Sequence, residues 1–404
     1  FNGTPHSTSM KKSLTALAAG TFALGIAEFV MMGILPDVAT HLGITIPQAG
    51  HFIAAYALGV CVGAPLLALI ARSQPLKRIL LGLGALILIG NLCTALAPDY
   101  WVMLATRFIS GLPHGAFFGV GSIVADKLAD KDKGAQAISI MVAGMTVANV
   151  LGVPLGTTIS HSLSWRFTFV LIALWSLVLV YLLWRWIPAI QALPDTGFAG
   201  QFRFLKTPVP WLILFATALG NGGAFCWLSY INPLMTTVSG FEPSEMTLLM
   251  MLAGLGMLIG NLAGGRLTDR YGPGKVAASS QGVMCLALLS IFFLAQNPIA
   301  SVVLMVVCTT CLFTVSAPQQ LLLIRNAKGG EMLGAASVQI AFNLGNALGA
   351  WVGGLPIEAG YAYQYTALPA SFFAFLGFAL LFYFWRRYEY PIRHVRATSF
   401  PKNS

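Results

Sequence analysis

Long apolar runs recur along the chain and are separated by short polar or charged stretches. Each run approaches the ~20 residues that an α-helix needs to cross a lipid bilayer. The first run is also longer than the apolar core of a secretory signal peptide, so a membrane span is the better interpretation. The pattern predicts twelve transmembrane helices, at residues 13–35, 46–71, 79–97, 101–125, 135–159, 166–187, 209–234, 245–268, 276–296, 299–323, 334–357 and 365–386.

The longest polar interruption divides these spans into two groups of six. We therefore expect a first helical bundle at residues 10–187, a cytoplasmic linker at residues 188–208 and a second bundle at residues 209–387. Residues 388–404 are expected to form a cytoplasmic tail. Residues 1–9 precede a Met-Lys-Lys sequence that is a natural start, so they are interpreted as an artificial extension.

An internal repeat relates the two groups of spans. Four glycines of the first half recur in the second half at a constant offset of 197 residues, and Asn149 meets Asn346 at the same offset. A parallel repeat of six helices indicates two similar bundles around a central axis, an architecture of secondary transporters. The sequence thus predicts an all-α polytopic membrane protein of two six-helix bundles. The glycine pairs are Gly59 and Gly256, Gly63 and Gly260, Gly152 and Gly349, and Gly156 and Gly353.

Composition and charge agree with a membrane protein. Hydrophobic residues make up 57% of the chain and charged residues only 9%, whereas soluble domains carry about 25% charged residues. The net charge of +10 does not indicate a nucleic-acid partner, because every Lys and Arg except Arg107 and Arg166 falls on one side of the predicted spans. The positive-inside rule assigns that side to the cytoplasm. We therefore expect a bacterial inner-membrane protein with both termini in the cytoplasm.

The sequence does not indicate an enzyme. The H-E-x-x-H, G-x-S-x-G and Walker A patterns are absent from it. The six cysteines lie in apolar runs, and none of them has metal-site spacing together with partner ligands. We therefore expect no metal and no cofactor, and we expect the proton gradient to supply the energy for transport.

Two charged residues lie well inside predicted spans, Glu28 in the first and Arg107 in the fourth. Six or seven residues separate each from the outer end of its span, which places both at a depth of about 10 Å. Charges in the membrane interior are costly and usually functional. We expect Glu28 to carry a proton and to contact substrate, with Arg107 as its partner; a static ion pair is the alternative.

His114 shares a helical face with Arg107. It is interpreted as a proton relay and substrate ligand, or else as a packing residue.

The second half offers amides and aromatic rings instead of charges. Asn221 and Asn232 are expected on one face of the seventh span. Amides and rings together suit a neutral polyol or an amphipathic drug; the alternative is that the amides join helices by hydrogen bonds. The candidate substrate contacts are Asn221, Trp227 and Tyr230 in span seven, Gln320 in span ten, and Gln339 and Asn343 in span eleven.

The loop after span eight, residues 265–275, reads GRLTDRYGPGK. Acidic and basic residues at helix ends can pair across a bundle interface and hold one conformation closed. Gly265, Asp269, Arg270 and Gly272 are therefore interpreted as a conformational latch, with an ordinary basic loop as the alternative. The corresponding loop at residues 72–78 keeps the basic residues but lacks the acid and the glycine.

Spans one, four and five contain further motifs. Span four has Arg107, then Gly111, and then PHGAFFG at residues 113–119, and span one has AEF at residues 27–29. In span five, Gly152, Pro154 and Gly156 partly match an antiporter motif, with tight helix packing as the alternative.

Together these motifs resemble those of the major facilitator superfamily, particularly its drug:proton antiporter family and bacterial arabinose-efflux permeases. The resemblance implies alternating access, in which proton influx drives export of a sugar or small drug-like molecule. Phe118 joins the candidate substrate contacts. The expected partners are a small-molecule substrate, protons and the lipid bilayer, and the expected state is a monomer. An uptake symporter and a non-transporting membrane sensor remain alternatives.

Overall fold

The computed structural model describes residues 5–44 and 46–392, so part of the expected extension and part of the expected tail lie outside the described residues. Twelve helices in the described chain are long and apolar enough to cross a membrane, which confirms the predicted number. Most are single helices: α1 (Pro5–Leu42), α2 (Ile46–Ala71), α3 (Leu76–Leu96), α4 (Tyr100–Leu128), α7 (Trp165–Trp186), α9 (Pro208–Leu228), α11 (Met246–Tyr271), α12 (Pro273–Leu294), α15 (Glu331–Glu358) and α16 (Ala367–Phe384).

Span five contains a π-helical turn. α5 (Gly134–Val147) continues through Ala148–Gly152 into α6 (Val153–Ser162). Pro154 has no backbone N–H and its ring crowds the carbonyl four residues earlier, so the regular hydrogen-bond ladder cannot pass this point. The turn brings Val150 against Gly254 of α11, in the other half of the protein.

Span ten is interrupted in a similar way. It consists of α13 (Pro298–Thr314) and α14 (Ser316–Arg325). Pro318 cannot donate a hydrogen bond to the carbonyl of Thr314, so the helix is broken at Val315.

Span seven is shorter than predicted. It ends at Leu228 instead of residue 234, because the ring of Pro233 is incompatible with a helical carbonyl at Ser229. The chain continues through the short α10 (Ile231–Pro233). Asn232 is exposed there, so the predicted shared face of Asn221 and Asn232 on one helix is wrong.

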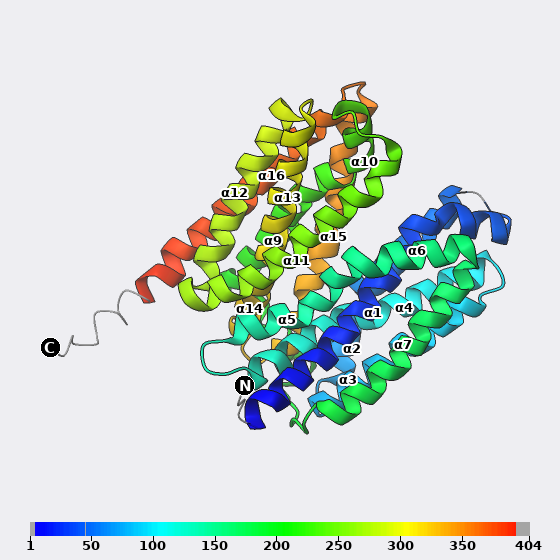
Figure 1. Ribbon diagram of the computed structural model, residues 1–404. Helices are drawn as coiled ribbons and strands as arrows, with labels where there is room; N and C mark the ends of the chain where they lie inside the picture. The colour runs from blue at the N-terminus through cyan, green and yellow to red at the C-terminus, as the bar shows by residue number, and fades with distance from the viewer. Residues whose placement is uncertain (1–4, 45, 393–404) are drawn as a thin grey trace.

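The first six spans form one bundle and the last six form another, which confirms the predicted fold class (Figure 1). The bundles lie together at the end where α5 begins and α11 ends, and they diverge toward the opposite end (Figure 1). Across the boundary α5 packs on α11, and α4 packs on α15. The core of the first bundle continues into the second through Leu321 and Ala335.

Glycines of the repeat allow helices to touch within each bundle. A Cβ atom at Gly63 of α2 would meet the backbone of Leu112 in α4, and one at Gly260 of α11 would meet the backbone of Thr310 in α13. The two glycines occupy equivalent places in the repeat. Small residues at such crossings let helix backbones approach closely in a membrane.

Gly63→Ala is therefore expected to destabilise the first bundle by about 1–3 kcal/mol, the usual cost of overpacking. Gly82→Ala in α3 is the matched control, because nothing lies within 4 Å of a Cβ atom there. Thermal unfolding of the two variants in detergent measures the difference. Equal unfolding temperatures would contradict the close contact of α2 and α4.

Arg166, one of the two exceptions to the charge pattern, has a structural role. Its Nη1 atom donates hydrogen bonds to the carbonyl oxygens of Ala95 at 2.9 Å and Ala97 at 2.8 Å. These carbonyls lie at the end of α3 and have no partners within that helix. Arg166 therefore caps α3, which explains a positive charge on this side of the membrane.

Candidate functional site

The first bundle contains a buried cluster of ionisable side chains. The Nε2 atom of His114 lies 3.7 Å from the Oε2 atom of Glu28, and the two side chains are 1% and 12% exposed. The Nδ1 atom of His114 lies 2.9 Å from the hydroxyl oxygen of Tyr56. The cluster thus joins α1, α2 and α4, and it brings Glu28 and His114 together.

Arg107 belongs to this cluster but forms no ion pair with Glu28 among the described residues. Its Nη1 atom donates to the carbonyl oxygen of Ala27 at 2.7 Å, and its Nε atom donates to that of Phe52 at 3.2 Å. The guanidinium also lies over the ring of Tyr56, 4.7 Å from the ring centroid. Arg107 and Glu28 still interact electrostatically. Arg107 therefore binds backbone carbonyls and an aromatic face, and it acts on the carboxyl group of Glu28 through its charge alone.

Two polar atoms of the cluster have no hydrogen-bond partner among the described residues. These atoms are Glu28 Oε2 and Arg107 Nη2, and both are buried. Buried polar groups nearly always have partners, so such exceptions indicate a functional requirement or a site for water. A carboxyl group with an oxygen that lacks a hydrogen-bond partner, beside a histidine, is suited to binding and releasing a proton.

Small residues bring the cluster together. A Cβ atom at Gly111 of α4 would meet the backbone of Tyr56, and one at Gly115 would lie 2.7 Å from Cβ of Ala64. The glycine four residues after Arg107 thus positions Tyr56 over the guanidinium. Gly115 also places α4 next to Gln339 of α15, whose Cβ would be 3.6 Å from the added atom.

A small cavity lies between the bundles beside this cluster. Its volume of about 30 Å³ leaves room for one or two water molecules. A solute the size of a sugar needs this part of the protein to open further. Aromatic rings and amides line the cavity, which suits a neutral hydrogen-bonding solute. The lining residues are Phe118, Val142 and Met145 of the first bundle and Asn221, Leu312, Phe313, Ser316, Gln319, Val338, Gln339 and Phe342 of the second.

Three of the expected substrate contacts, Phe118, Asn221 and Gln339, line this cavity. The Oδ1 atom of Asn221 is buried without a hydrogen-bond partner in the described chain. Asn343 lies one turn from Gln339 but donates a 2.8 Å hydrogen bond to the carbonyl oxygen of Gln339. Its amide thus contacts the helix backbone instead of the cavity.

The glutamine of span ten that lines the cavity is Gln319 and not the predicted Gln320. Gln320 donates a 2.8 Å hydrogen bond to the carbonyl oxygen of Ala335 and joins two helices. Gln319 lines the cavity, and its Nε2 atom has no partner among the described residues. The break at Val315 sets the rotation of α14, so the sequence alone did not indicate which of two adjacent glutamines faces inward.

Trp227 and Tyr230 do not line the cavity. Trp227 is 1% exposed and packs in the core of the second bundle. The hydroxyl group of Tyr230 donates a 2.9 Å hydrogen bond to the carbonyl oxygen of Ala350 in α15. Because α9 ends at Leu228, Tyr230 is not a continuation of the helical face that carries Asn221.

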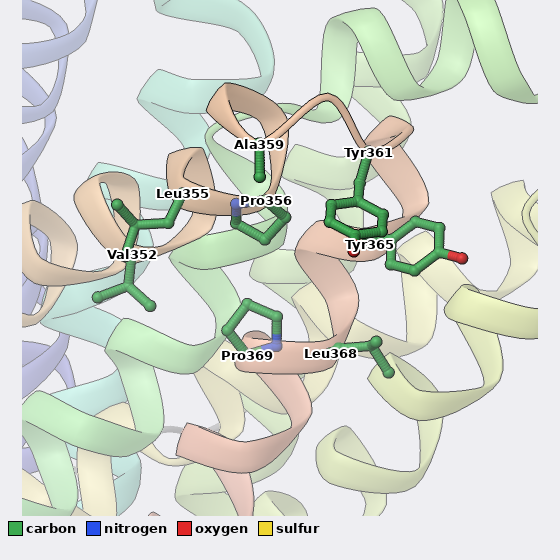
Figure 2. A pocket seen from close by; sticks show the side chains of 8 residues that line it. All are labelled: Val352, Leu355, Pro356, Ala359, Tyr361, Tyr365, Leu368 and Pro369. Atoms are coloured by element: carbon green, nitrogen blue, oxygen red, sulfur yellow. The ribbon is translucent and has the colours of Figure 1, made fainter.

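A second, more open pocket lies between α15 and α16 (Figure 2). Tyr361 and Tyr365 lie at one end of it, and Pro356 and Pro369 face each other across it (Figure 2). The pocket has no charged or amide side chain in its lining. Its polar groups are the hydroxyl groups of Tyr361 and Tyr365, and it has no carboxyl group or histidine that could carry a proton. We therefore do not assign it to proton-coupled transport.

Asp269, the acid of the candidate latch, forms hydrogen bonds with a helix terminus of the first bundle. Its carboxylate accepts hydrogen bonds from the backbone N–H groups of Ala135 at 3.1 Å and Gln136 at 2.9 Å. These are unpaired amides in the first turn of α5, where the helix dipole favours a negative charge. The residue thus caps a helix of the opposite bundle. Arg325 also acts on this carboxylate electrostatically, but no ion pair between the two side chains forms within the part of the chain that the structure describes.

The other residues of the latch shape this contact. Gly265 lets α11 approach Ser139 of α5, where a Cβ atom would lie 2.8 Å from the serine Cβ. Gly272 has a φ of 102°, a value that favours glycine, and it turns the chain into α12. Arg270 lies over the ring of Tyr271, 5.2 Å from the ring centroid.

The equivalent position in the first half is Arg72, 197 residues before Asp269. Arg72 pairs with Asp195 of the linker at 3.1 Å. Thr196, the next residue, donates a 2.7 Å hydrogen bond to the carbonyl oxygen of Gly329, before α15. The first-half loop therefore contacts the linker, whereas Asp269 contacts a helix terminus of the opposite bundle.

The motif residues of span five pack against the helix that carries Glu28. Cβ atoms at Gly152 and Gly156 would approach Ile26 and Val30 of α1, respectively. Pro154 follows the π-helical turn. These residues let α1 pack closely against span five, which agrees with the interpretation of tight helix packing.

The buried carboxyl cluster, the amide-lined cavity and the two bundles define a polytopic membrane transporter. The chain belongs to the Major Facilitator Superfamily, whose family model matches residues 17–339. It is 48% identical to AraJ of Escherichia coli (strain K12) over 377 residues, which cover 93% of this chain and 96% of that protein.

Two further comparisons extend this result. A chloramphenicol resistance protein of Streptomyces lividans is 30% identical over 344 residues, or 84% of this chain and 88% of that protein. The solved structure of the proton:xylose symporter XylE superposes with a TM-score of 0.77 at 14% identity, covering 95% of this chain and 96% of that one. At this identity the likeness to XylE concerns the fold alone.

Proposed function

We propose that the protein is a proton-coupled antiporter that exports a small neutral molecule by alternating access. The observation that carries this proposal is the open carboxyl oxygen of Glu28, buried 3.7 Å from His114. A carboxyl group that alternates between an apolar and a hydrated setting binds and releases a proton. The proton gradient then supplies the energy, and no cofactor is needed.

The chemistry of the cavity supports a neutral, hydrogen-bonding substrate. The cavity lining has no charged side chain among the described residues, and Asn221 and Gln319 present unpartnered amide atoms. Phe118, Phe313 and Phe342 supply apolar faces. A sugar such as L-arabinose and a neutral drug such as chloramphenicol both fit these requirements. The relationship to a chloramphenicol resistance protein supports export.

The direction of opening follows from the charge pattern. The positive-inside rule assigns the start of α5 and the end of α11 to the cytoplasm, together with both termini. Because the bundles meet at this end (Figure 1), we propose that the structure corresponds to an outward-facing state. We propose that the protein works in this way as a monomer in the bacterial inner membrane.

Uptake symport is the competing proposal. Inverted vesicles with an acidic interior distinguish the two, with chloramphenicol and L-arabinose as probes. Antiport predicts that added solute is accumulated while protons leave the vesicle. Loss of solute from preloaded vesicles together with protons would indicate symport, and solute movement without proton movement would overturn proton coupling.

Gln319→Ala is expected to weaken solute binding roughly 5- to 30-fold, because one hydrogen bond worth about 1–2 kcal/mol is lost. Gln320→Ala is the matched control, since this adjacent amide bonds to Ala335 and does not line the cavity. Calorimetric titration of both purified variants with the probe that binds the wild type measures the effect. An equal loss in the two variants would contradict the assignment of Gln319 to the cavity.

A further inference from the structure

Gln339 contacts both the carboxyl cluster and the solute cavity. It lies beside His114, because its Cβ atom would be 3.6 Å from a Cβ atom at the next residue, Gly115, and its side chain interacts with His114. It also lines the cavity beside Asn221 and Gln319. His114 lies 3.7 Å from Glu28. Gln339 belongs to α15 of the second bundle, whereas His114 and Glu28 belong to the first. It is thus the polar side chain through which the two sites meet.

Few other ionisable groups surround this contact. Glu28 faces it from α1, Tyr56 from α2 and Arg107 from α4, and these three interact with one another. The cavity side contributes amides, a serine and apolar residues, without a charged group in the described lining. Protonation of Glu28 is therefore the nearest change of charge that can alter the interaction of Gln339 with His114.

The hydrogen-bonding capacity of His114 limits what it can do at one time. A neutral imidazole has one N–H donor and one acceptor nitrogen. The Nδ1 atom lies 2.9 Å from the hydroxyl group of Tyr56. If Tyr56 donates to Nδ1, the Nε2 atom carries the single N–H, and that donor faces a choice between the carboxyl group of Glu28 and the amide oxygen of Gln339.

We infer that Gln339 is the residue that couples protonation of Glu28 to solute binding, through competition for the Nε2–H group of His114. This inference rests on the proposed antiport. When Glu28 is ionised, its carboxylate is the stronger acceptor and takes the Nε2–H group, so the amide of Gln339 is free to bind solute. When Glu28 is protonated, His114 donates to Gln339 and withdraws that amide from the cavity. Proton and solute therefore exclude each other, as antiport requires.

The test is the pH dependence of solute binding to the purified protein, with chloramphenicol and L-arabinose as the neutral probes. If one bound proton excludes solute, the apparent affinity for solute falls by up to about tenfold for each pH unit of acidification. Wild-type protein is expected to show this slope. Gln339→Ala is expected to flatten it while keeping measurable binding, and Gln339→Met serves as a variant of similar volume if the alanine variant is unstable.

Two other variants separate the possible outcomes. Gln319→Ala should weaken binding at every pH and leave the slope unchanged, because Gln319 lines the cavity without contacting His114. A wild-type slope in both folded Gln339 variants would overturn the coupling role of Gln339. A wild-type slope in Glu28→Gln would instead overturn the proposed proton site itself. Failure of both probes to bind the wild type would overturn the assignment of the cavity to a neutral solute.

Discussion

Glu28→Gln is expected to abolish proton-driven accumulation of solute and to leave passive exchange intact. Glutamine keeps the size and most hydrogen-bonding capacity of the side chain but cannot release a proton. In reconstituted vesicles, a gradient of one pH unit supports roughly tenfold accumulation for each proton exchanged. The variant is expected to reach equal concentrations on both sides. Isotopic solute measured inside the vesicles at steady state gives the result.

Asp37→Asn provides the matched control for this experiment. Asp37 lies on the same helix, is 32% exposed and pairs with His161 at 2.6 Å, away from the cavity. Its replacement should leave accumulation unchanged. Undiminished accumulation in Glu28→Gln would show that another group carries the proton.

Asp269→Asn is expected to shift the protein away from the state in which the bundles meet at α5 and α11. The carboxylate caps two backbone N–H groups of α5, and a cap of this kind contributes about 0.5–2 kcal/mol. A loss of 1–2 kcal/mol changes the balance of two states about 5- to 30-fold. Ser139, 2% exposed in this contact, reports the shift. A cysteine at position 139 should be alkylated faster by about the same factor, as read by peptide mass spectrometry.

Asp132→Asn is the control for charge alone. Asp132 lies in the loop just before α5 and has a φ of 62°, a conformation that asparagine tolerates. The carboxylate that accepts the hydrogen bonds of Ala135 and Gln136 at the start of α5 belongs to Asp269 instead. Equal alkylation rates in the Asp269→Asn and Asp132→Asn backgrounds would contradict the role of Asp269 in holding the bundles together.

The membrane topology could be predicted because lipid imposes strong constraints on sequence. A membrane helix must satisfy its backbone internally and present apolar side chains, so span length and number are visible in the hydropathy pattern. The repeat was visible because glycines such as Gly63 and Gly260 have equivalent backbone contacts in the two halves. Glu28 and His114 were found because a polar group at such depth is rare.

The details of the cavity could not be predicted, because they depend on helix rotation. The breaks near Pro318 and Pro233 decide that Gln319 faces the cavity and that Tyr230 does not. An apolar pattern does not give the angle at which a helix resumes after a break. The actual partner of Asp269 was also hidden, since backbone amides at a helix start leave no signal in residue type.

Substrate-dependent proton movement in wild-type vesicles distinguishes a proton-coupled antiporter from a transporter without proton coupling. The protein is reconstituted with a pH-sensitive dye inside, an acidic interior is imposed, and chloramphenicol or L-arabinose is added outside. We expect the interior to become more alkaline when solute is added, while solute is accumulated. In Glu28→Gln we expect neither alkalinisation nor accumulation. Accumulation of solute without a change of internal pH would contradict proton coupling.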